Sequence, residues 1–262
     1  MPRRCFPGKG PAILVLALGA ALAAGVLYPP EAGVIPPALA RSRLFAQYDR
    51  DLNGYVLQVM AGYEGGRYPY LLNRDYAHYN GVTRDLYYRG RLLLRASPNG
   101  SRASHCVGIT FEAFFRAVQA RNRRLGLPID YFNGLTWDEL YDLALTWYAA
   151  KGDKASSNCA MAIERYGFGR RIHDPLAAEP GDFMDLTRAD GSGHTVVFFG
   201  WLRSAGRIIG LRYWSSQAST RGIGYNAEYF RDNPPHLLRG SLLRAPIYIG
   251  RVGPVRSYRP PR

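Results

Sequence analysis

Hydrophobic side chains recur every three or four residues in four stretches in the first two-thirds of the chain. This spacing is typical of helices with one buried face. The predicted helices cover residues 43–61, 106–125, 136–150 and 157–166. Thr136-Trp-Asp-Glu139 has the pattern of a capping box and marks the start of the third helix, and Gly167 marks the end of the fourth.

The pattern changes after about residue 180. Short apolar segments separated by glycine-rich turns predict strands, and the segments cover residues 182–186, 195–201, 208–214 and 246–251. Residues 85–96 carry strand-like side chains on both sides of Arg89-Gly90, which predicts a short hairpin. Helices followed by an antiparallel sheet indicate an α+β fold.

The N-terminus has a different pattern. Arg3, Arg4 and Lys9 precede an apolar run that ends at residue 28, so residues 1–28 are predicted to be a signal peptide or a membrane anchor. Residues 29–42 are rich in proline and alanine and are predicted to be a linker. We therefore expect an exported protein of the periplasm or cell envelope, either free or anchored to the inner membrane.

The remaining chain is simplest to describe as one domain over residues 43–250, followed by a flexible tail over 251–262. The formal net charge is +14, and 47% of the residues are hydrophobic, which favours a packed globular protein with a basic surface. A basic surface fits an anionic envelope polymer or a membrane surface. The chain lacks zinc-finger spacing and RNA-binding aromatic motifs, so nucleic acid is not an expected partner. The oligomeric state stays open.

Cys106 has the sequence context of a nucleophile. It opens the second predicted helix, where the positive end of the helix dipole favours a thiolate. Gly108 is expected to leave the first turn open to a substrate carbonyl, and a backbone N–H there could stabilise an oxyanion. Because the cysteines of an exported protein can be oxidised, a Cys106–Cys159 disulfide is the alternative interpretation. Cys159 also begins a helix, but its apolar neighbours favour a packing role.

A thiol nucleophile needs a base, and His194 is the best-placed of the five histidines. It follows small glycines at the mouth of a predicted strand, which fixes its backbone and leaves an open approach. The alternative for His194 is a solvated histidine at a turn. His105 adjoins Cys106 but would point away from it on a helix. The other histidines lie in loops or turns and are expected to be surface or structural residues: His78, His173 and His236.

The strand after His194 ends in polar residues that could orient its imidazole. Gln217 is the first choice because its side-chain carbonyl can accept from a ring N–H. Ser215 shares the same strand face and is the second choice, and Ser216 would serve if the strand bends. These residues could also simply end a strand. Asp182 and Asp185 lie around a Pro-Gly turn and are assigned no chemistry.

Three aromatic residues are candidates for substrate binding, with core packing as the alternative for each. They are Tyr87, Tyr88 and Trp214. Their flat rings suit the faces of a sugar or a peptide.

Three sequence blocks together resemble the NlpC-type cell-wall peptidases and their CHAP-amidase relatives. The blocks are HCVGITFEAF, PGDFMDL and SGHTVVFFGW, and the resemblance covers about residues 100–218. It implies a papain-like fold, with Cys106 and His194 at the first and third blocks and the third catalytic residue within 215–217. It also implies cleavage of an amide bond in a peptidoglycan peptide, with no metal or cofactor.

Two departures from the family pattern leave the reaction open. Val107 stands where the family usually has a small serine, and 88 residues (194 − 106) separate the cysteine from the histidine. The long separation predicts a helical insertion at about 125–178. An acyltransferase or transamidase on the same fold is one alternative function. The other is a non-catalytic envelope-binding protein with the Cys106–Cys159 disulfide.

Overall fold

The computed structural model of the protein describes residues 50–63, 68–73 and 75–262. The predicted signal or anchor (1–28) and linker (29–42) lie outside these residues, as does the first part of the helix predicted at 43–61. Within the described ranges, none of the helices has both the length and the apolar character needed to cross a membrane.

The helices of the described part begin and end close to their predicted positions. They are α2 (Asn53–Ala61), α3 (Cys106–Leu125), α4 (Trp137–Trp147) and α5 (Cys159–Arg165). The capping box before α4 is confirmed, since Thr136 Oγ1 accepts from Glu139 N at 3.2 Å and Glu139 Oε2 accepts from Thr136 N at 2.7 Å. Helix α3 ends at Gly126, whose φ of 68° favours glycine.

An antiparallel six-stranded sheet forms the other half of the fold, in the order β3-β8-β4-β5-β6-β7. Its strands are β3 (Gly169–Ile172), β4 (Phe183–Thr187), β5 (Gly193–Ser204), β6 (Arg207–Gln217), β7 (Gly222–Tyr229) and β8 (Tyr248–Val252). The α+β prediction is confirmed. The two edge strands, β3 and β7, were not predicted, because their glycines and polar residues do not follow the apolar pattern of a buried strand.

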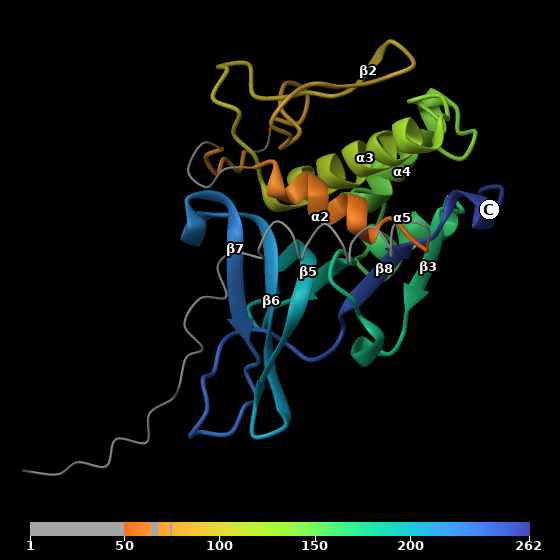
Figure 1. The fold of residues 1–262 in the computed structure, drawn as a ribbon. Helices are drawn as coiled ribbons and strands as arrows, with labels where there is room; N and C mark the ends of the chain where they lie inside the picture. The colour runs from red at the N-terminus through yellow and green to blue at the C-terminus, as the bar shows by residue number, and fades with distance from the viewer. Residues whose placement is uncertain (1–49, 64–67, 74) are drawn as a thin grey trace, which may run out of the picture.

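The predicted hairpin is also present, as β1 (Leu86–Tyr88) and β2 (Arg91–Leu94), joined at Arg89-Gly90. These two strands form a sheet of their own. In Figure 1 the hairpin lies above the helices, on the side away from the large sheet.

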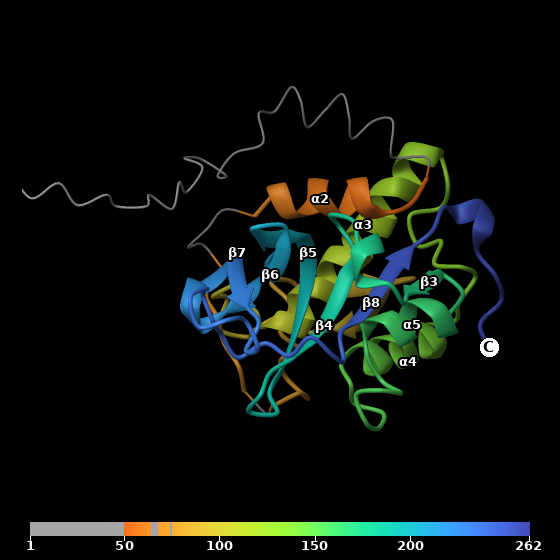
Figure 2. The same ribbon diagram turned by 90° about the horizontal axis from the view of Figure 1, so that it is seen from below.

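The large sheet buries both of its faces. Helix α3 packs against β5 and β6, and α5 packs against β3, β4 and β8. In Figure 2, which is seen from below, the sheet lies in front of α3. Successive strand residues point to opposite faces. The core under the helices therefore contains Phe183, Val197 and Trp214. Their neighbours in sequence pack in a second core on the other face: Met184, Val196, Phe198 and Tyr213.

The Pro-Gly-Asp turn before β4 is held by a buried ion pair. Arg251 Nε and Nη2 each lie 2.8 Å from an oxygen of Asp182, and Arg251 Nη1 lies 2.7 Å from Glu179 Oε1. Asn53 Nδ2 also donates to Asp182 Oδ1 at 2.9 Å. Asp182 thus joins the start of α2 to β4 and β8, which is the structural role expected of it.

The C-terminal segment, predicted to be a flexible tail over 251–262, packs against the rest of the structure. The end of β8 already includes Arg251 and Val252. Beyond it, Arg262 N donates to Arg165 O at 2.9 Å, and the Tyr258 ring packs on Phe168 with 4.9 Å between ring centroids. In Figure 1 the C-terminus accordingly lies beside β3. A short polar sequence gives no sign of such docking.

Candidate functional site

Cys106 is the first residue of α3, as predicted, and His105 caps that helix. The His105 Nδ1 atom accepts a hydrogen bond from Gly108 N at 3.3 Å. The His105 ring is buried in edge-to-face contact with Tyr79 and Tyr148, and burial lowers the pKa of His105 to about 4. A neutral ring with Nδ1 as acceptor is therefore the stable form, and this cap role agrees with the prediction that His105 is not the base.

Gly108 has a different purpose from the expected one. A Cβ atom at this position would lie 2.2 Å from Gly81 O, so the absence of a side chain lets the 80–81 backbone pack against the first turn of α3. Gly108 is fully buried in that contact rather than facing an approaching substrate. The glycine thus positions the nucleophile helix against the preceding loop.

His194 and Gln217 are brought together at the ends of β5 and β6. His194 Nε2 lies 2.8 Å from Gln217 Oε1, the contact expected for an orienting carbonyl. The His194 Nδ1 atom has no hydrogen-bond partner among the described residues. Ser215 does not reach the imidazole, because its hydroxyl donates to Thr195 O at 2.8 Å. Of the two candidates, Gln217 is the one beside His194.

The sheet is split at this end, because the backbones of β5 and β6 are not paired there. Pairing between β5 and β6 begins at Val197–Trp214, whereas β5 stays paired with β4 as far as Gly193 and β6 stays paired with β7 as far as Gln217. The segment before α3 is fastened next to this split, because Ser216 Oγ donates to Ser104 O at 3.1 Å. The start of α3 therefore meets the sheet where two central strands diverge.

The thiol of Cys106 reaches this split from the helix side. Burial raises its pKa above the usual value, although the backbone N–H groups of Thr195 and Val107 donate toward the sulfur and partly oppose the rise. The residue keeps partial solvent exposure. Because desolvation outweighs the donors, the resting group is a neutral thiol, not the thiolate expected from the helix dipole alone.

The peptide group between His194 and Thr195 connects the proposed base to Cys106, because the Thr195 N–H donates toward the Cys106 sulfur. No hydrogen bond joins the thiol to the imidazole in the described part of the chain. Strand alternation points Thr195 toward α3 and His194 toward the opposite face, where its ring meets Tyr213 with 5.3 Å between centroids. The two groups therefore approach the same strand end from its two sides.

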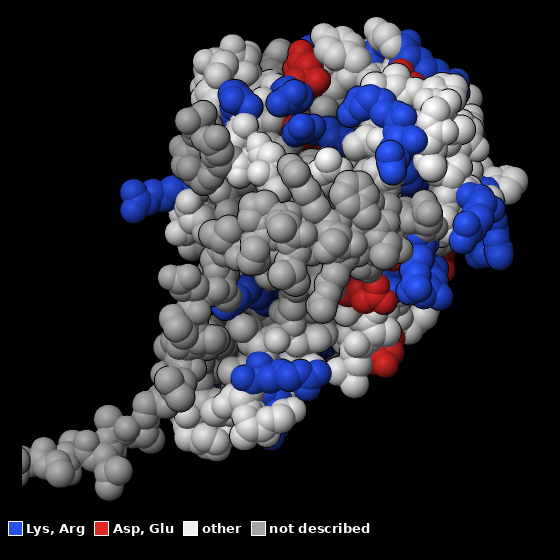
Figure 3. Space-filling model, in the orientation of Figure 1, with Lys and Arg blue, Asp and Glu red and all other residues white. Residues whose placement is uncertain are grey.

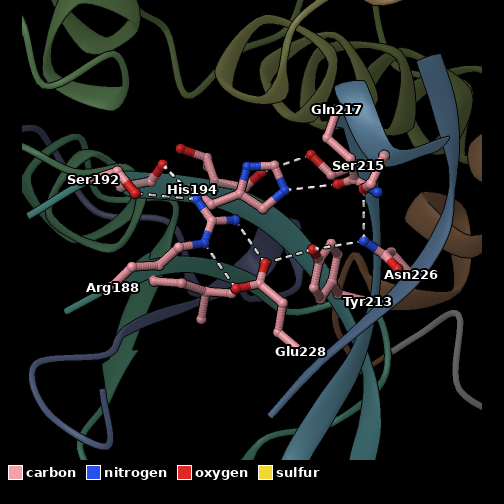
Figure 4. Close-up of polar contacts among 12 residues, drawn as sticks. Arg188, Ser192, His194, Tyr213, Ser215, Gln217, Asn226 and Glu228 are labelled. Carbon is pink, nitrogen blue, oxygen red and sulfur yellow. Dashed lines mark hydrogen bonds and ion pairs between the residues drawn. The ribbon is translucent and has the colours of Figure 1, made fainter. Parts of the chain in front are cut away.

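A charged network holds the far side of His194. Arg188 binds Glu228 through two hydrogen bonds of 2.8 and 2.6 Å, and the Tyr213 hydroxyl donates to Glu228 Oε1 at 2.6 Å. Figure 4 shows this network beside the His194–Gln217 contact. Burial, followed by the Arg188 charge, lowers the pKa of His194 to about 4. The imidazole is thus neutral over most of the physiological pH range.

Two further polar residues lie near Cys106 and were missed in the sequence. Burial raises the pKa of the Tyr70 phenol, and the negative charge of an ionised Cys106 nearby raises it further. Lys154 lies near Leu186, which pairs with His194 in the sheet. Tyr70 belongs to a tyrosine-rich loop and Lys154 to a turn between two helices, so only the folded chain brings them to this strand end.

The structure corrects two of the predicted substrate-binding residues. Tyr88 and Trp214 are buried in the main core, and the Tyr88 hydroxyl donates to Leu135 O at 2.5 Å. Tyr87 is half-exposed, but it lies on the β1–β2 hairpin, where Arg89, two residues further on, donates its backbone N–H to Asp130 beyond the end of α3. Helix α3 has 20 residues and is about 30 Å long, so this place is remote from Cys106.

Cys159 is fully buried in the core, as its packing role requires, and its backbone N–H donates to Asp185 Oδ2 at 2.9 Å. Asp185 also accepts from Thr195 Oγ1 at 2.6 Å, so this carboxyl group braces α5 against β5. Both Cys106 and Cys159 are free, so the alternative disulfide is not formed. This removes the observation on which the disulfide-linked binding protein depended.

A cavity of about 580 Å³ lies elsewhere, near the C-terminus, and none of the candidate site residues lines it. Comparisons of the chain with protein-family models, with curated proteins and with solved structures each gave no match.

Proposed function

We propose that this protein is an exported cysteine hydrolase that cleaves an amide bond in cell-wall peptides, on a fold of the papain-like type. Cys106 is the nucleophile, His194 the general base and Gln217 the residue that orients His194. The main support is the 2.8 Å contact between His194 Nε2 and Gln217 Oε1. The Gln217 carbonyl oxygen can only accept a hydrogen bond, so the ring proton of neutral His194 is on Nε2. The lone pair of the ring is then on Nδ1 and is available to a thiol.

In this proposal the first step forms an acyl-enzyme. The Cys106 sulfur bonds to the substrate carbonyl carbon while its proton passes to His194 Nδ1, and His194 then gives that proton to the leaving amine as the C–N bond breaks. Water next attacks the thioester, loses a proton to His194, and releases a carboxylic acid and the free thiol. Gln217 keeps the ring in the required tautomer through both steps.

The resting charges favour a neutral thiol and imidazole over an ion pair. The pKa of Cys106 is raised by burial, and the pKa of His194 is lowered by burial and by Arg188. His194 therefore acts as a general base during attack, as in hydrolases with a hydroxyl nucleophile. The thiol and the imidazole approach the strand end from its two sides in the free protein, so the proposal requires that substrate binding bring them together.

An oxyanion donor is available at the helix start. The Cys106 backbone N–H is one of the first amides of α3, which have no acceptor inside the helix, and among the described residues it has no acceptor elsewhere. A tetrahedral oxyanion formed at Cys106 would lie next to this donor.

The surface charge fits an anionic wall polymer. The net charge is +14, and the face drawn in Figure 3 carries many more basic than acidic side chains, in several separate groups. Such a surface would attract an anionic partner over a distance of about 8–10 Å at physiological salt.

A labelling and product assay tests the proposed function. The wild-type protein is incubated with purified muropeptides, and mass spectrometry follows newly released amino groups before and after treatment with a maleimide. We expect amine release to stop in proportion to modification of Cys106, while buried Cys159 stays unmodified in the folded protein. Transfer of the acyl group to a second peptide without release of an acid would indicate a transamidase instead. No change in the muropeptides would contradict the proposal.

The variant Gln217→Glu tests the role of His194 through the pH profile. A carboxylate at this position stabilises the imidazolium and raises the pKa of His194 from its lowered value of about 4. Because the base must be neutral, kcat/KM falls as the pH drops through this pKa, so the acidic limb should move to higher pH by about one unit or more. The same exchange at exposed Gln58 on α2 is the control, and an unshifted limb in Gln217→Glu would argue against His194 as the base.

A further inference from the structure

Lys154 is a half-buried cation at the strand end that carries the proposed site. Its ammonium group donates to Leu186 O and lies 3.3 Å from Thr187 Oγ1. It also lies 3.0 Å from the position that a Cβ atom of Gly193 would take, directly before His194. Leu186 and His194 are paired residues of β4 and β5, so the backbone connects the lysine to the proposed base.

The partners of Lys154 are neutral. Within the described ranges no carboxylate lies within ion-pair distance of its ammonium group. Asp185 is the carboxyl group that most favours the charged lysine, but its oxygens bind Cys159 N and Thr195 Oγ1 instead. Burial lowers the pKa of Lys154 accordingly. The other lysine of this region differs, since Lys151 is paired with Asp142.

An ammonium group has three protons, and among the residues that the structure describes two acceptors bind it. The third proton and the uncompensated charge are available to an anion on the side of the sheet from which Cys106 approaches. Gly193 has no side chain, so the ammonium group can lie 3.0 Å from the position that its Cβ atom would take, and Gly193 itself is exposed to solvent. A second cation, Arg188, does not serve in this way because Glu228 already binds it through two hydrogen bonds.

We propose that Lys154 binds a carboxylate of the substrate close to the scissile amide, so that the protein selects acidic peptides with a free carboxylate at that point. This inference rests on the proposed function for the position of the scissile bond. It assigns substrate selection to a residue outside the three blocks of the family resemblance. The carboxylate would supply the missing third hydrogen bond and the counter-charge of the lysine.

The test compares native muropeptides with the same muropeptides after their carboxylates have been converted to amides with carbodiimide and ammonia. Steady-state kinetics are measured for the wild type, Lys154→Gln and the matched control Lys151→Gln. For the wild type and the control, amidation should raise KM about tenfold or more, with a smaller effect on kcat, because a charge-assisted hydrogen bond is lost. For Lys154→Gln, KM should be equally high on both pools. Lys154→Met serves if Lys154→Gln does not fold.

A binding measurement separates this inference from the proposed function. Calorimetric titration of Cys106→Ala with each pool should show tighter binding of native muropeptides, and the preference should vanish in Cys106→Ala/Lys154→Gln. If the wild type cleaves neither pool but Cys106→Ala binds native muropeptides more tightly, the hydrolase proposal fails and the carboxylate site stands. Equal cleavage of both pools by the wild type, or the same loss in Lys151→Gln as in Lys154→Gln, would overturn the carboxylate site.

Discussion

Cys106→Ala is expected to abolish amide cleavage, with kcat/KM on muropeptides reduced at least about 10³-fold. In the proposed mechanism the variant lacks the atom that forms the acyl bond, and none of the other proposed groups can take over the covalent step. The loss of one sulfur atom at the first turn of α3 should leave the fold intact, since His105 still caps the helix and Gly108 still contacts Gly81.

Cys159→Ala is the matched control. It removes the same atom from a helix start, but this residue is fully buried. Alanine loses the hydrogen bond of the thiol to Asp185 and retains the bond that the backbone N–H donates to the same carboxyl group. Cleavage should therefore continue, with stability reduced by about 1 kcal/mol because of the small cavity. Full activity in Cys106→Ala, or equal loss in both variants, would eliminate Cys106 as the nucleophile.

The second large effect is expected on stability, from Arg251→Met. Asp182 is fully buried and loses both hydrogen bonds of its ion pair, so the free energy of unfolding should drop by about 3–5 kcal/mol. For a protein of this size, this corresponds to a decrease in Tm of roughly 6–20 °C. Thermal unfolding followed by circular dichroism measures the change.

Arg171→Met provides the comparison for Arg251→Met. Its ion pair with Glu164 is 2.6 Å long but partly exposed on edge strand β3, and such pairs contribute about 0–1 kcal/mol. A loss as small in Arg251→Met as in Arg171→Met would show that the Asp182 pair does not join α2, β4 and β8 in the way inferred from its contacts.

Local sequence signals were sufficient for much of the fold. Helix α3 has the predicted bounds because apolar side chains recur at helical spacing along its 20 residues. Strands β4, β5, β6 and β8 were found because they are central and apolar. Strands β3 and β7 were missed because an edge strand is stabilised by its neighbour and needs little apolar alternation of its own.

Part of the candidate site could likewise be predicted from the sequence, and part could not. The contact of His194 with Gln217 could be predicted, since two strands joined by a short turn place their far ends side by side. The burial of Tyr88 and Trp214 could not, because an aromatic residue has the same sequence signal whether it lies in the core or on the surface. The charge state of Cys106 was also misjudged, because the dipole of its own helix is visible in sequence but desolvation by other elements is not.

The sequence by itself determined the order of elements, the α+β class and the residue types able to supply a nucleophile, a base and an orienting carbonyl, because these depend on periodicity and short spacing. Only the tertiary structure decided that Gly108 serves packing, that both described cysteines are free, and that Lys154 and Arg188 lie beside the strand end of His194. These properties arise from contacts between segments far apart in the chain, where burial and charge depend on every neighbouring element.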